Sequence, residues 1–377
     1  MTSFICSKCG RKFPLGSKAF KCSCGGLFDL EFESHFPVAD IEQRPHNMWR
    51  YREALPIESD RSIVTMSEGY TPLIEEKICG KNVFIKMDHL LPTGSYKDRG
   101  ASLLVSYARE HQVSSLVEDS SGNAGCSIAA YSARAGISCE IFVPDHTSVG
   151  KLRQIEAYGS KVRLVEGSRE DVSRKILEQT KESFYASHVY NPVFLHGTKT
   201  LAFEICEQLG WNSPGAIVVP VGNGTLLLGA SIGFGELYSA GIVDNLPKII
   251  AVQAENCAPL LRAFEMNQKD SADVNAEATV SEGIAIEKPV RGAQILKAVR
   301  DSRGTFVGVS EQEIIETWKE MSKRGHFVEP TSAATIAGLK KYISKTDPNE
   351  TIASVFTGHG LKTACELFSW NKQKGLN

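Results

Sequence analysis

The residue with the clearest chemistry in this sequence is Lys97, in the stretch Pro92–Gly100. An apolar run at 83–87 predicts a strand before that stretch, and the pattern at 101–108 predicts a helix after it, so Lys97 lies at or just before a helix N-terminus. The positive end of a helix disfavours a second cation, which favours the neutral amine that a Schiff-base nucleophile needs. Taken alone, Lys97 would more simply be a solvated lysine in a polar loop.

Three other segments place polar residues or glycines directly after predicted strands. The loop 120–124 precedes a predicted helix at 126–135, and its hydroxyls and backbone N–H groups could hold a substrate carboxylate. The loop 222–225 follows the apolar run 216–221, and its glycines would let the backbone approach a phosphate closely. A hydroxyl follows the predicted strand that ends at 356, where ligands bind in open α/β sheets. The residues concerned are Ser120, Ser121, Gly122, Asn123, Ala124, Gly222, Asn223, Gly224, Thr225 and Thr357.

Each of these segments alone is common as an ordinary helix cap or turn, but together with Lys97 they suggest a single cofactor. Pyridoxal 5'-phosphate (PLP) requires a lysine that bonds to it, a cradle for its phosphate and a partner for its ring nitrogen. The segments offer all three, and the loop 120–124 remains for the carboxylate of an amino-acid substrate. The sequence therefore predicts a PLP site.

The same segments resemble those of the fold-type II (tryptophan synthase β-like) PLP enzymes, and most of all those of the threonine synthases. The resemblance extends from about residue 68 to 363 and rests on the motifs Thr93–Gly100, Ser120–Ala124, Pro220–Thr225, Glu329–Ala334 and Thr357–Lys362. It implies that Lys97 binds the cofactor and is the catalytic acid–base group, and that Asn123 lies beside the cofactor's phenolic oxygen. It further implies that Thr357 meets the pyridine nitrogen and that the phosphate is surrounded by Gly222, Asn223, Gly224 and Thr225.

The resemblance implies a PLP-dependent lyase of amino-acid metabolism, which turns O-phospho-L-homoserine and water into L-threonine and phosphate. One departure favours an alternative. Phe194 stands where threonine synthases carry an arginine, and an aromatic ring cannot replace a guanidinium on a phosphate. The segment Ser281–Ile286 also resembles the serine/threonine dehydratases. The alternative is a serine/threonine ammonia-lyase or a β-replacement enzyme that acts on a 3-substituted alanine.

Two histidines near this departure, His188 and His196, have two interpretations. They could contact an anionic leaving group, or they could be ordinary polar residues near the mouth of a pocket. A further hypothesis from another class is a zinc-ribbon protein that uses a decayed enzyme fold as a binding module. The intact lysine and phosphate loops argue against that hypothesis.

Composition excludes several other classes of protein. The net charge of -2 gives no footprint for nucleic acid or an anionic membrane, and no apolar run reaches the length of a membrane helix. The N-terminus lacks the charged and apolar regions of a secretory signal, and the cysteines beyond residue 30 are scattered singly, as in a reducing cytosol. We therefore expect a cytoplasmic enzyme with a small amino-acid substrate, and the resemblance implies a homodimer.

Strands that alternate with helices from residue 83 onward predict an α/β fold with two open parallel-sheet domains. We expect a large PLP domain of residues 31–97 plus 191–377. Residues 98–190 are expected to form a small, mobile α/β domain that closes on the substrate. Residues 1–30 would form a cysteine-rich extension that resembles a zinc ribbon.

That extension carries two cysteine pairs. The first pair is Cys6 and Cys9, and the second is Cys22 and Cys24. Each pair is followed by a glycine, which allows a tight turn through which four thiolates could converge on tetrahedral zinc. The second pair has one intervening residue, where zinc knuckles usually have two or more. The alternative to a structural zinc ion is a ribbon that keeps its shape without metal.

Overall fold

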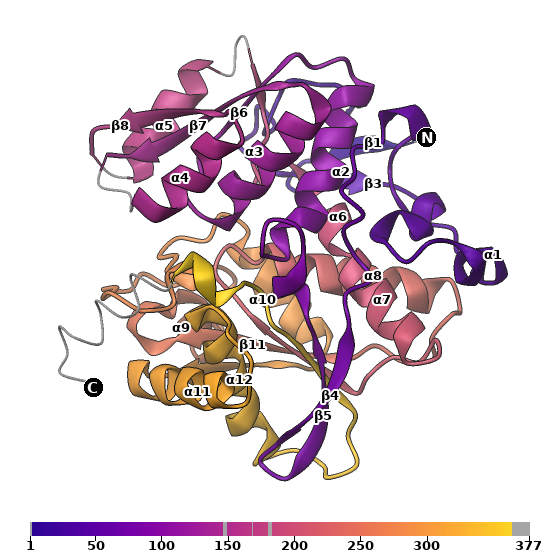
Figure 1. The fold of residues 1–377 in the computed structure, drawn as a ribbon, viewed down its shortest axis with the longest axis vertical. Helices are drawn as coiled ribbons and strands as arrows, with labels where there is room; N and C mark the ends of the chain where they lie inside the picture. The colour runs from indigo at the N-terminus through magenta and orange to yellow at the C-terminus, as the bar shows by residue number, and fades with distance from the viewer. Residues whose placement is uncertain (1, 146–148, 168, 180–182, 364–377) are drawn as a thin grey trace. The chain divides into compact units, whose positions relative to one another are not determined.

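The computed structural model describes residues 2–145, 149–167, 169–179 and 183–363 (Figure 1). By its internal contacts the chain divides into two compact units. Unit 1 comprises residues 1–70 and 97–200, and unit 2 comprises residues 71–96 and 201–377. The domains predicted from the sequence, residues 31–97 plus 191–377 and residues 98–190, have other boundaries and stay a prediction.

Unit 1 begins with a small antiparallel sheet of the order β2-β1-β3. Phe4 and Phe28 stack there with ring centroids 5.9 Å apart, and the ring of Phe4 also lies 6.1 Å from that of Tyr107. Tyr107 belongs to α2 (Lys97–Glu110), so the N-terminal sheet packs on the helix that begins at Lys97. The three strands are β1 (Ser3–Cys6), β2 (Lys12–Phe13) and β3 (Phe28–Glu31).

The larger sheet of unit 1 has four parallel strands in the order β8-β7-β6-β9. Because alternate side chains of a strand point to opposite faces, the two faces have separate cores. Leu116 and Ile141 pack with residues of α3 and α4, whereas Val117 and Phe142 pack with residues of α5. The elements are β6 (Ser115–Glu118), β7 (Ser138–Pro144), β8 (Lys161–Val165), β9 (Phe184–Tyr185), α3 (Asn123–Ala135), α4 (Val149–Ala157) and α5 (Arg169–Gln179).

Residues 31–70 are anchored to the helices of unit 1 through a buried carboxylate. Glu68 accepts hydrogen bonds from Trp49 Nε1 and from the Tyr131 hydroxyl of α3, both at 2.9 Å. The hydroxyl of Ser102 in α2 donates to the same carboxylate at 2.5 Å. Because a buried carboxylate needs such partners, this network ties the segment to both helices. Unit 1 also contains α1 (Val38–Gln43), α6 (Pro192–Thr198) and 3-10 helices at Met48–Ala54 and Asp60–Ser62.

Unit 2 is built on a six-stranded sheet of the order β12-β11-β10-β13-β5-β4. Its strands are β4 (Leu73–Ile78), β5 (Lys81–Lys86), β10 (Ala216–Pro220), β11 (Lys248–Ala254), β12 (Thr305–Val309) and β13 (Ile352–Val355). The prediction of a parallel sheet is wrong at one edge, because β4 pairs antiparallel with β5 and the sheet is mixed. The cause is the two-residue turn Cys79-Gly80, whose φ angles of 49° and 83° suit a tight hairpin.

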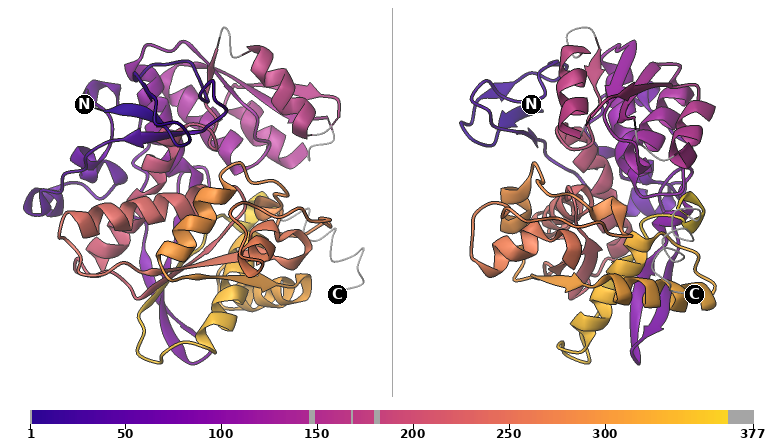
Figure 2. Two further views of the ribbon diagram at one scale, coloured as in Figure 1. Left: turned by 180° about the vertical axis from the view of Figure 1, so that it is seen from behind. Right: turned by 90° about the vertical axis from the view of Figure 1, so that its left-hand side faces the viewer.

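Helices cover both faces of this mixed sheet. On one face, residues of α11 and α12 share a core with Val218 and Val252. On the other face, which the left view of Figure 2 shows, α8 contacts β10 and β11, and α10 contacts β11. The fold is therefore α/β, with parallel and mixed sheets. In the described part of the chain, no helix is long and apolar enough to cross a membrane.

The helices of this half of the chain include four short 3-10 helices, at Asp88–Leu90, Glu255–Cys257, Glu282–Ile284 and Gly360–Lys362. The α-helices are α7 (Thr200–Gln208), α8 (Thr225–Ser239), α9 (Pro259–Glu265), α10 (Gly292–Asp301), α11 (Glu311–Lys323) and α12 (Pro330–Ile343).

Candidate active site

Lys97 is the first residue of α2 and is half-buried. Its Nζ lies 5.6 Å from the centroid of the Phe194 ring in α6. Two glycines allow α2 and α6 to approach each other this closely. A Cβ added at Gly100 would lie 2.4 Å from the Phe194 ring, and one added at Gly197 would lie 2.2 Å from the backbone oxygen of Arg99. Lys97 is thus held beside an aromatic ring by two tightly packed helices.

Phe194 is the residue at which the resemblance would place an arginine, and its side chain is fully buried. Position 194 therefore offers an apolar surface beside Lys97 and no positive charge. His196 does not offer one either, because its Nδ1 lies 3.0 Å from Lys199 Nζ in the interior. Burial and the Lys199 ammonium lower the pKa of His196 well below its ordinary value, so this imidazole is neutral.

The loop 120–124 connects β6 to α3 in the same unit. α3 begins at Asn123, three residues earlier than predicted, and Gly122 is its N-cap without a side-chain cap. The Ser120 hydroxyl accepts a hydrogen bond from the N–H of Gly122 at 3.3 Å. A Cβ added at Gly125 would lie 1.9 Å from the Ser120 backbone oxygen, so only glycine lets the loop fold back on α3. The result is a compact, partly accessible turn at a helix N-terminus, which suits a carboxylate.

One hydrogen bond connects α3, the helix after this loop, to α2, the helix that begins at Lys97. Asp98, directly after Lys97, is fully buried and accepts from the hydroxyl of Ser127 in α3 at 2.7 Å. Unit 1 therefore holds Lys97 and the loop 120–124 at the starts of two helices that this bond joins. Their roles toward cofactor and substrate stay predictions.

In unit 2 the loop 222–225 connects β10 to α8. Gly224 has a φ of +75°, which favours glycine, and it caps α8 without a side-chain hydrogen bond. A Cβ added at Gly222 would lie 3.0 Å from the Cα of Ile284, so the loop has no room for a side chain there. A glycine loop whose helix N-terminus is not capped by a side chain fits a phosphate group.

Thr357 follows β13 in unit 2 and is almost fully buried. Its hydroxyl lies 3.1 Å from Ser332 Oγ, which also accepts from the Thr357 N–H at 2.8 Å. Tyr96 joins this group to the glycine loop: its N–H donates to the Thr357 carbonyl at 3.0 Å, and its hydroxyl lies 2.9 Å from Thr225 Oγ1. Tyr96 directly precedes Lys97 in the chain. No role was predicted for Tyr96 or Ser332, although both lie within the motifs that carry the resemblance.

The predicted cofactor residues are thus divided between the units. Lys97 and Asn123 belong to unit 1, whereas the loop 222–225 and Thr357 belong to unit 2. Within each unit the side chains fit PLP: a half-buried amine in the first, and a glycine cradle and a fixed hydroxyl in the second.

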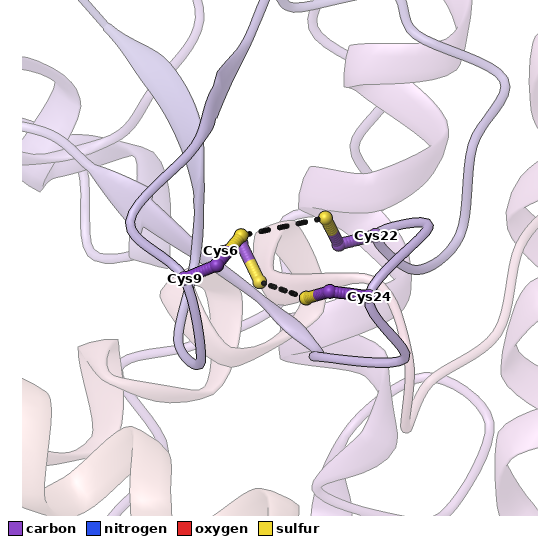
Figure 3. A group of neighbouring side chains, drawn as sticks. All are labelled: Cys6, Cys9, Cys22 and Cys24. Carbon is purple, nitrogen blue, oxygen red and sulfur yellow. Dashed lines mark hydrogen bonds between the residues drawn. The ribbon is translucent and has the colours of Figure 1, made fainter.

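The four N-terminal cysteines converge in unit 1 (Figure 3). Their Sγ atoms all lie within 4.8 Å of one another, with 3.5 Å between Cys6 and Cys24 and 3.7 Å between Cys9 and Cys22. Four bonds of about 2.3 Å to a tetrahedral zinc ion would place the sulfurs about 3.8 Å apart. Burial raises the pKa of the Cys6 thiol, but hydrogen bonds from the backbone of Cys9 and Lys8 and from the side chains of Cys24 and Cys9 together outweigh it and lower that pKa to about 6. The donor set and its spacing fit one zinc ion.

Comparison with known proteins supports the same chemistry. The family described as "Pyridoxal-phosphate dependent enzyme" matches residues 64–358. The threonine synthase of Methanocaldococcus jannaschii is 37% identical over 372 residues, which cover 95% of this chain and 92% of that protein. The threonine synthase of Methanosarcina acetivorans is 34% identical over 371 residues, which cover 95% and 91%. A solved fungal L-serine ammonia-lyase from Rhizomucor miehei shares the fold, with a TM-score of 0.69 at 21% identity over 80% of this chain and 97% of that one. The chain therefore belongs to the family of pyridoxal-phosphate-dependent enzymes and is related within it to the threonine synthases.

Proposed function

We propose that this chain is a threonine synthase, which converts O-phospho-L-homoserine and water to L-threonine and phosphate. The observation that carries the proposal is the identity of 37% to a threonine synthase along 95% of the chain. The geometry adds support, because each unit presents groups of the kind that the cofactor requires.

When bound, PLP withdraws electrons from the α-carbon of an amino acid and makes its proton acidic. Lys97 would hold the cofactor and then move protons at the α- and β-carbons of the substrate. The loop 222–225 would bind the cofactor's phosphate, and Asn123 would lie beside its phenolic oxygen. The loop 120–124 would bind the substrate carboxylate.

Thr357 would meet the ring nitrogen of the cofactor. Its hydroxyl is neutral and is held by Ser332 at 3.1 Å, so it does not keep that nitrogen protonated as a carboxylate would. A weaker electron sink favours elimination over transamination, which is the type of reaction that the proposal needs.

The test is to incubate cofactor-loaded protein with O-phospho-L-homoserine and to measure phosphate and L-threonine in the same samples. Equal amounts of both are expected from the wild type. Lys97→Ala is expected to form neither product and to lose the visible absorption of the lysine-bound cofactor. A wild type that forms neither product would contradict the proposed reaction, and a variant with full activity would contradict the role of Lys97.

Phe194 favours a second candidate, an ammonia-lyase or β-replacement enzyme that acts on serine, threonine or a 3-substituted alanine. The buried ring takes the place at which threonine synthases bear an arginine for the substrate phosphate. The same protein is incubated with these amino acids, and 2-oxo acid and ammonia are measured. Their formation without any threonine from O-phospho-L-homoserine would establish the second candidate and exclude the first.

We also propose that Cys6, Cys9, Cys22 and Cys24 hold a structural zinc ion in a ribbon-like extension. The proposal is supported by the mutual approach of the four Sγ atoms. Metal analysis is expected to find one zinc ion per chain in the wild type and none in Cys9→Ser. Cys79→Ser is the matched control, because Cys79 is also an exposed thiol but lies outside the cluster. A wild-type protein without bound zinc would contradict this proposal and would favour the alternative, a ribbon that keeps its shape without metal.

Three further features are proposals of the same kind: a cytoplasmic location, a homodimer, and a small domain of residues 98–190 that moves against residues 31–97 plus 191–377. The location is supported by the cysteines, all of which are free thiols in the described residues. Light scattering should give twice the mass of one chain. Small-angle scattering with and without a substrate analogue should detect domain closure.

A further inference from the structure

A buried pair of an acid and a histidine lies beside Lys97 and takes no part in the function above. Glu118 ends β6, and the Nδ1 of His188 lies 2.7 Å from its Oε1. The side chain of Glu118 is 0% exposed, whereas that of His188 is 11% exposed. The pair therefore reaches the accessible surface only through the imidazole.

Phe194 places this imidazole on the same aromatic ring as the lysine. The ring of His188 lies 5.9 Å from that of Phe194 with the planes at 68°, and Lys97 Nζ lies 5.6 Å from the same ring. All three residues belong to unit 1. His188 is thus a neighbour of the residue that stands in the place of an arginine.

The surroundings of Glu118 favour the uptake of a proton by the pair. Burial raises the pKa of Glu118 well above its ordinary value, Asp119 raises it further, and Lys97 acts in the opposite direction. The second oxygen, Oε2, is buried and has no hydrogen-bond partner in the described part of the chain. When the pair holds two protons, one lies between Glu118 and Nδ1 and the other is on Nε2, whereas a pair with one proton keeps it between Glu118 and Nδ1 and leaves Nε2 as an acceptor. An anionic group beside Nε2 favours the state with two protons. The outer nitrogen of His188 is then a hydrogen-bond donor.

We propose that His188, held by Glu118, donates from Nε2 to the anionic distal group of the substrate, the phosphate of a phosphorylated amino acid. The identity of that group rests on the proposed function. Hydrogen bonds to phosphate oxygens are among the strong ones in proteins, so a donor at this place offsets the loss of the arginine. His188 is a binding residue, and Glu118 is a positioning residue that acts through it.

The test uses two ligands that differ only in the distal group. L-2-amino-5-phosphonopentanoate carries a phosphono group on carbon, which cannot leave, and L-norvaline has the same carbon chain without it. Their dissociation constants are measured on cofactor-loaded enzyme by the change in visible absorption and by calorimetry. The wild type is expected to prefer the phosphonate. In His188→Gln that preference is expected to fall about 10- to 100-fold, the effect of one hydrogen bond to a charged group, while norvaline binding stays the same.

Two further variants separate binding from structure. His196→Gln removes the other histidine of this region, which contacts Lys199, and is expected to leave the preference unchanged. In the wild type the preference should fall as the pH rises, because the pair loses one of its two protons and Nε2 becomes an acceptor. In Glu118→Gln the side-chain amide can donate to Nδ1 and keep a proton on Nε2 of the neutral imidazole, so this fall should disappear. The other groups that act electrostatically with Glu118 are the same in both proteins, namely Asp119, Lys97, Cys139 and Tyr185.

Each contrary result has its own meaning. A wild type without any preference for the phosphonate would overturn both the inference and the phosphorylated substrate of the proposed function. A wild type with the preference and a His188→Gln variant that keeps it would overturn the inference alone. Equal weakening of both ligands in His188→Gln would also overturn it, because that effect is structural.

Discussion

Among single residues, Tyr96 connects two of the candidate cofactor residues of unit 2. Its backbone N–H is bonded to Thr357 and its hydroxyl to Thr225. Tyr96 therefore supports the candidate cofactor residues of unit 2 without being predicted to touch the reacting atoms.

Tyr96→Phe is expected to weaken PLP binding about 2- to 10-fold, because the net loss of one hydrogen bond costs about 0.5–1.5 kcal/mol. The dissociation constant is measured by equilibrium dialysis with detection of the visible absorption. Tyr238→Phe is the control, since Tyr238 in the last turn of α8 is 49% exposed. If Tyr96→Phe binds the cofactor as tightly as the wild type, the hydrogen bond to Thr225 does not support the site.

The sequence could predict residues whose neighbours in the chain give them their setting. Lys97 at the start of α2 is such a residue, because the strand before it and the helix after it are both local patterns. The sequence could not predict Ser332 beside Thr357 or Glu118 beside His188, because these partners are far apart in the chain. A charged residue at the end of an apolar strand was the one visible sign of Glu118.

Among the elements, α2 and α6 are set against each other by glycines. At Gly197 the space for a Cβ is taken by the backbone oxygen of Arg99, which cannot move without moving α2. At Gly235 in α8 nothing lies within 4 Å of an added Cβ. The two glycines therefore form a matched pair, one in a tight contact and one in an open helix.

Gly197→Ala is expected to lower the free energy of unfolding by about 1–3 kcal/mol, as overpacking does. Gly235→Ala is expected to raise it by about 0.5–1 kcal/mol, because alanine restricts the unfolded chain and favours the helix. Urea unfolding followed by circular dichroism measures both. A Gly197→Ala protein as stable as the wild type would refute the close contact of α2 with α6.

Elements with a clear start and stop could be predicted to within a few residues. α3 ends at Gly136, whose φ of +68° is the helix stop that a glycine at this place predicts. The helices and the strand between 292 and 343 were missed, although Ser310 and Glu313 form a capping box before α11 that sequence inspection could have found. The antiparallel β4 was missed because its hairpin turn, Cys79-Gly80, is not a common turn sequence.

In the whole molecule, the chain passes from one unit to the other after Tyr70, after Tyr96 and after Thr200. No Pro-rich, Gly-rich or charged linker marks these points in the sequence. Each unit is built from segments that are far apart in the chain. Long-range contacts, such as those of Glu68, determine which segments belong to the same unit. The alternation of strands and helices predicts the fold class, whereas long-range contacts define the two compact units.

Removal of zinc is expected to lower the midpoint temperature of thermal unfolding, because an ion bound only by the folded state stabilises it. The N-terminal sheet next to the cysteines packs on α2 through Phe4 and Tyr107. Unfolding of this sheet should therefore also destabilise α2. Calorimetry with and without a chelator measures the midpoint. Cys9→Ser should no longer respond to the chelator, and a wild type that does not respond would contradict a structural zinc ion.

The most direct test of threonine synthesis by this chain follows the oxygen atoms during the reaction of O-phospho-L-homoserine in water enriched in ¹⁸O. Elimination breaks the bond between carbon and the ester oxygen, and water then adds to carbon. Mass spectrometry is therefore predicted to find one heavy oxygen in L-threonine and none in the phosphate at early times. Heavy oxygen in the phosphate together with accumulating homoserine, or no threonine at all, would contradict the proposed function.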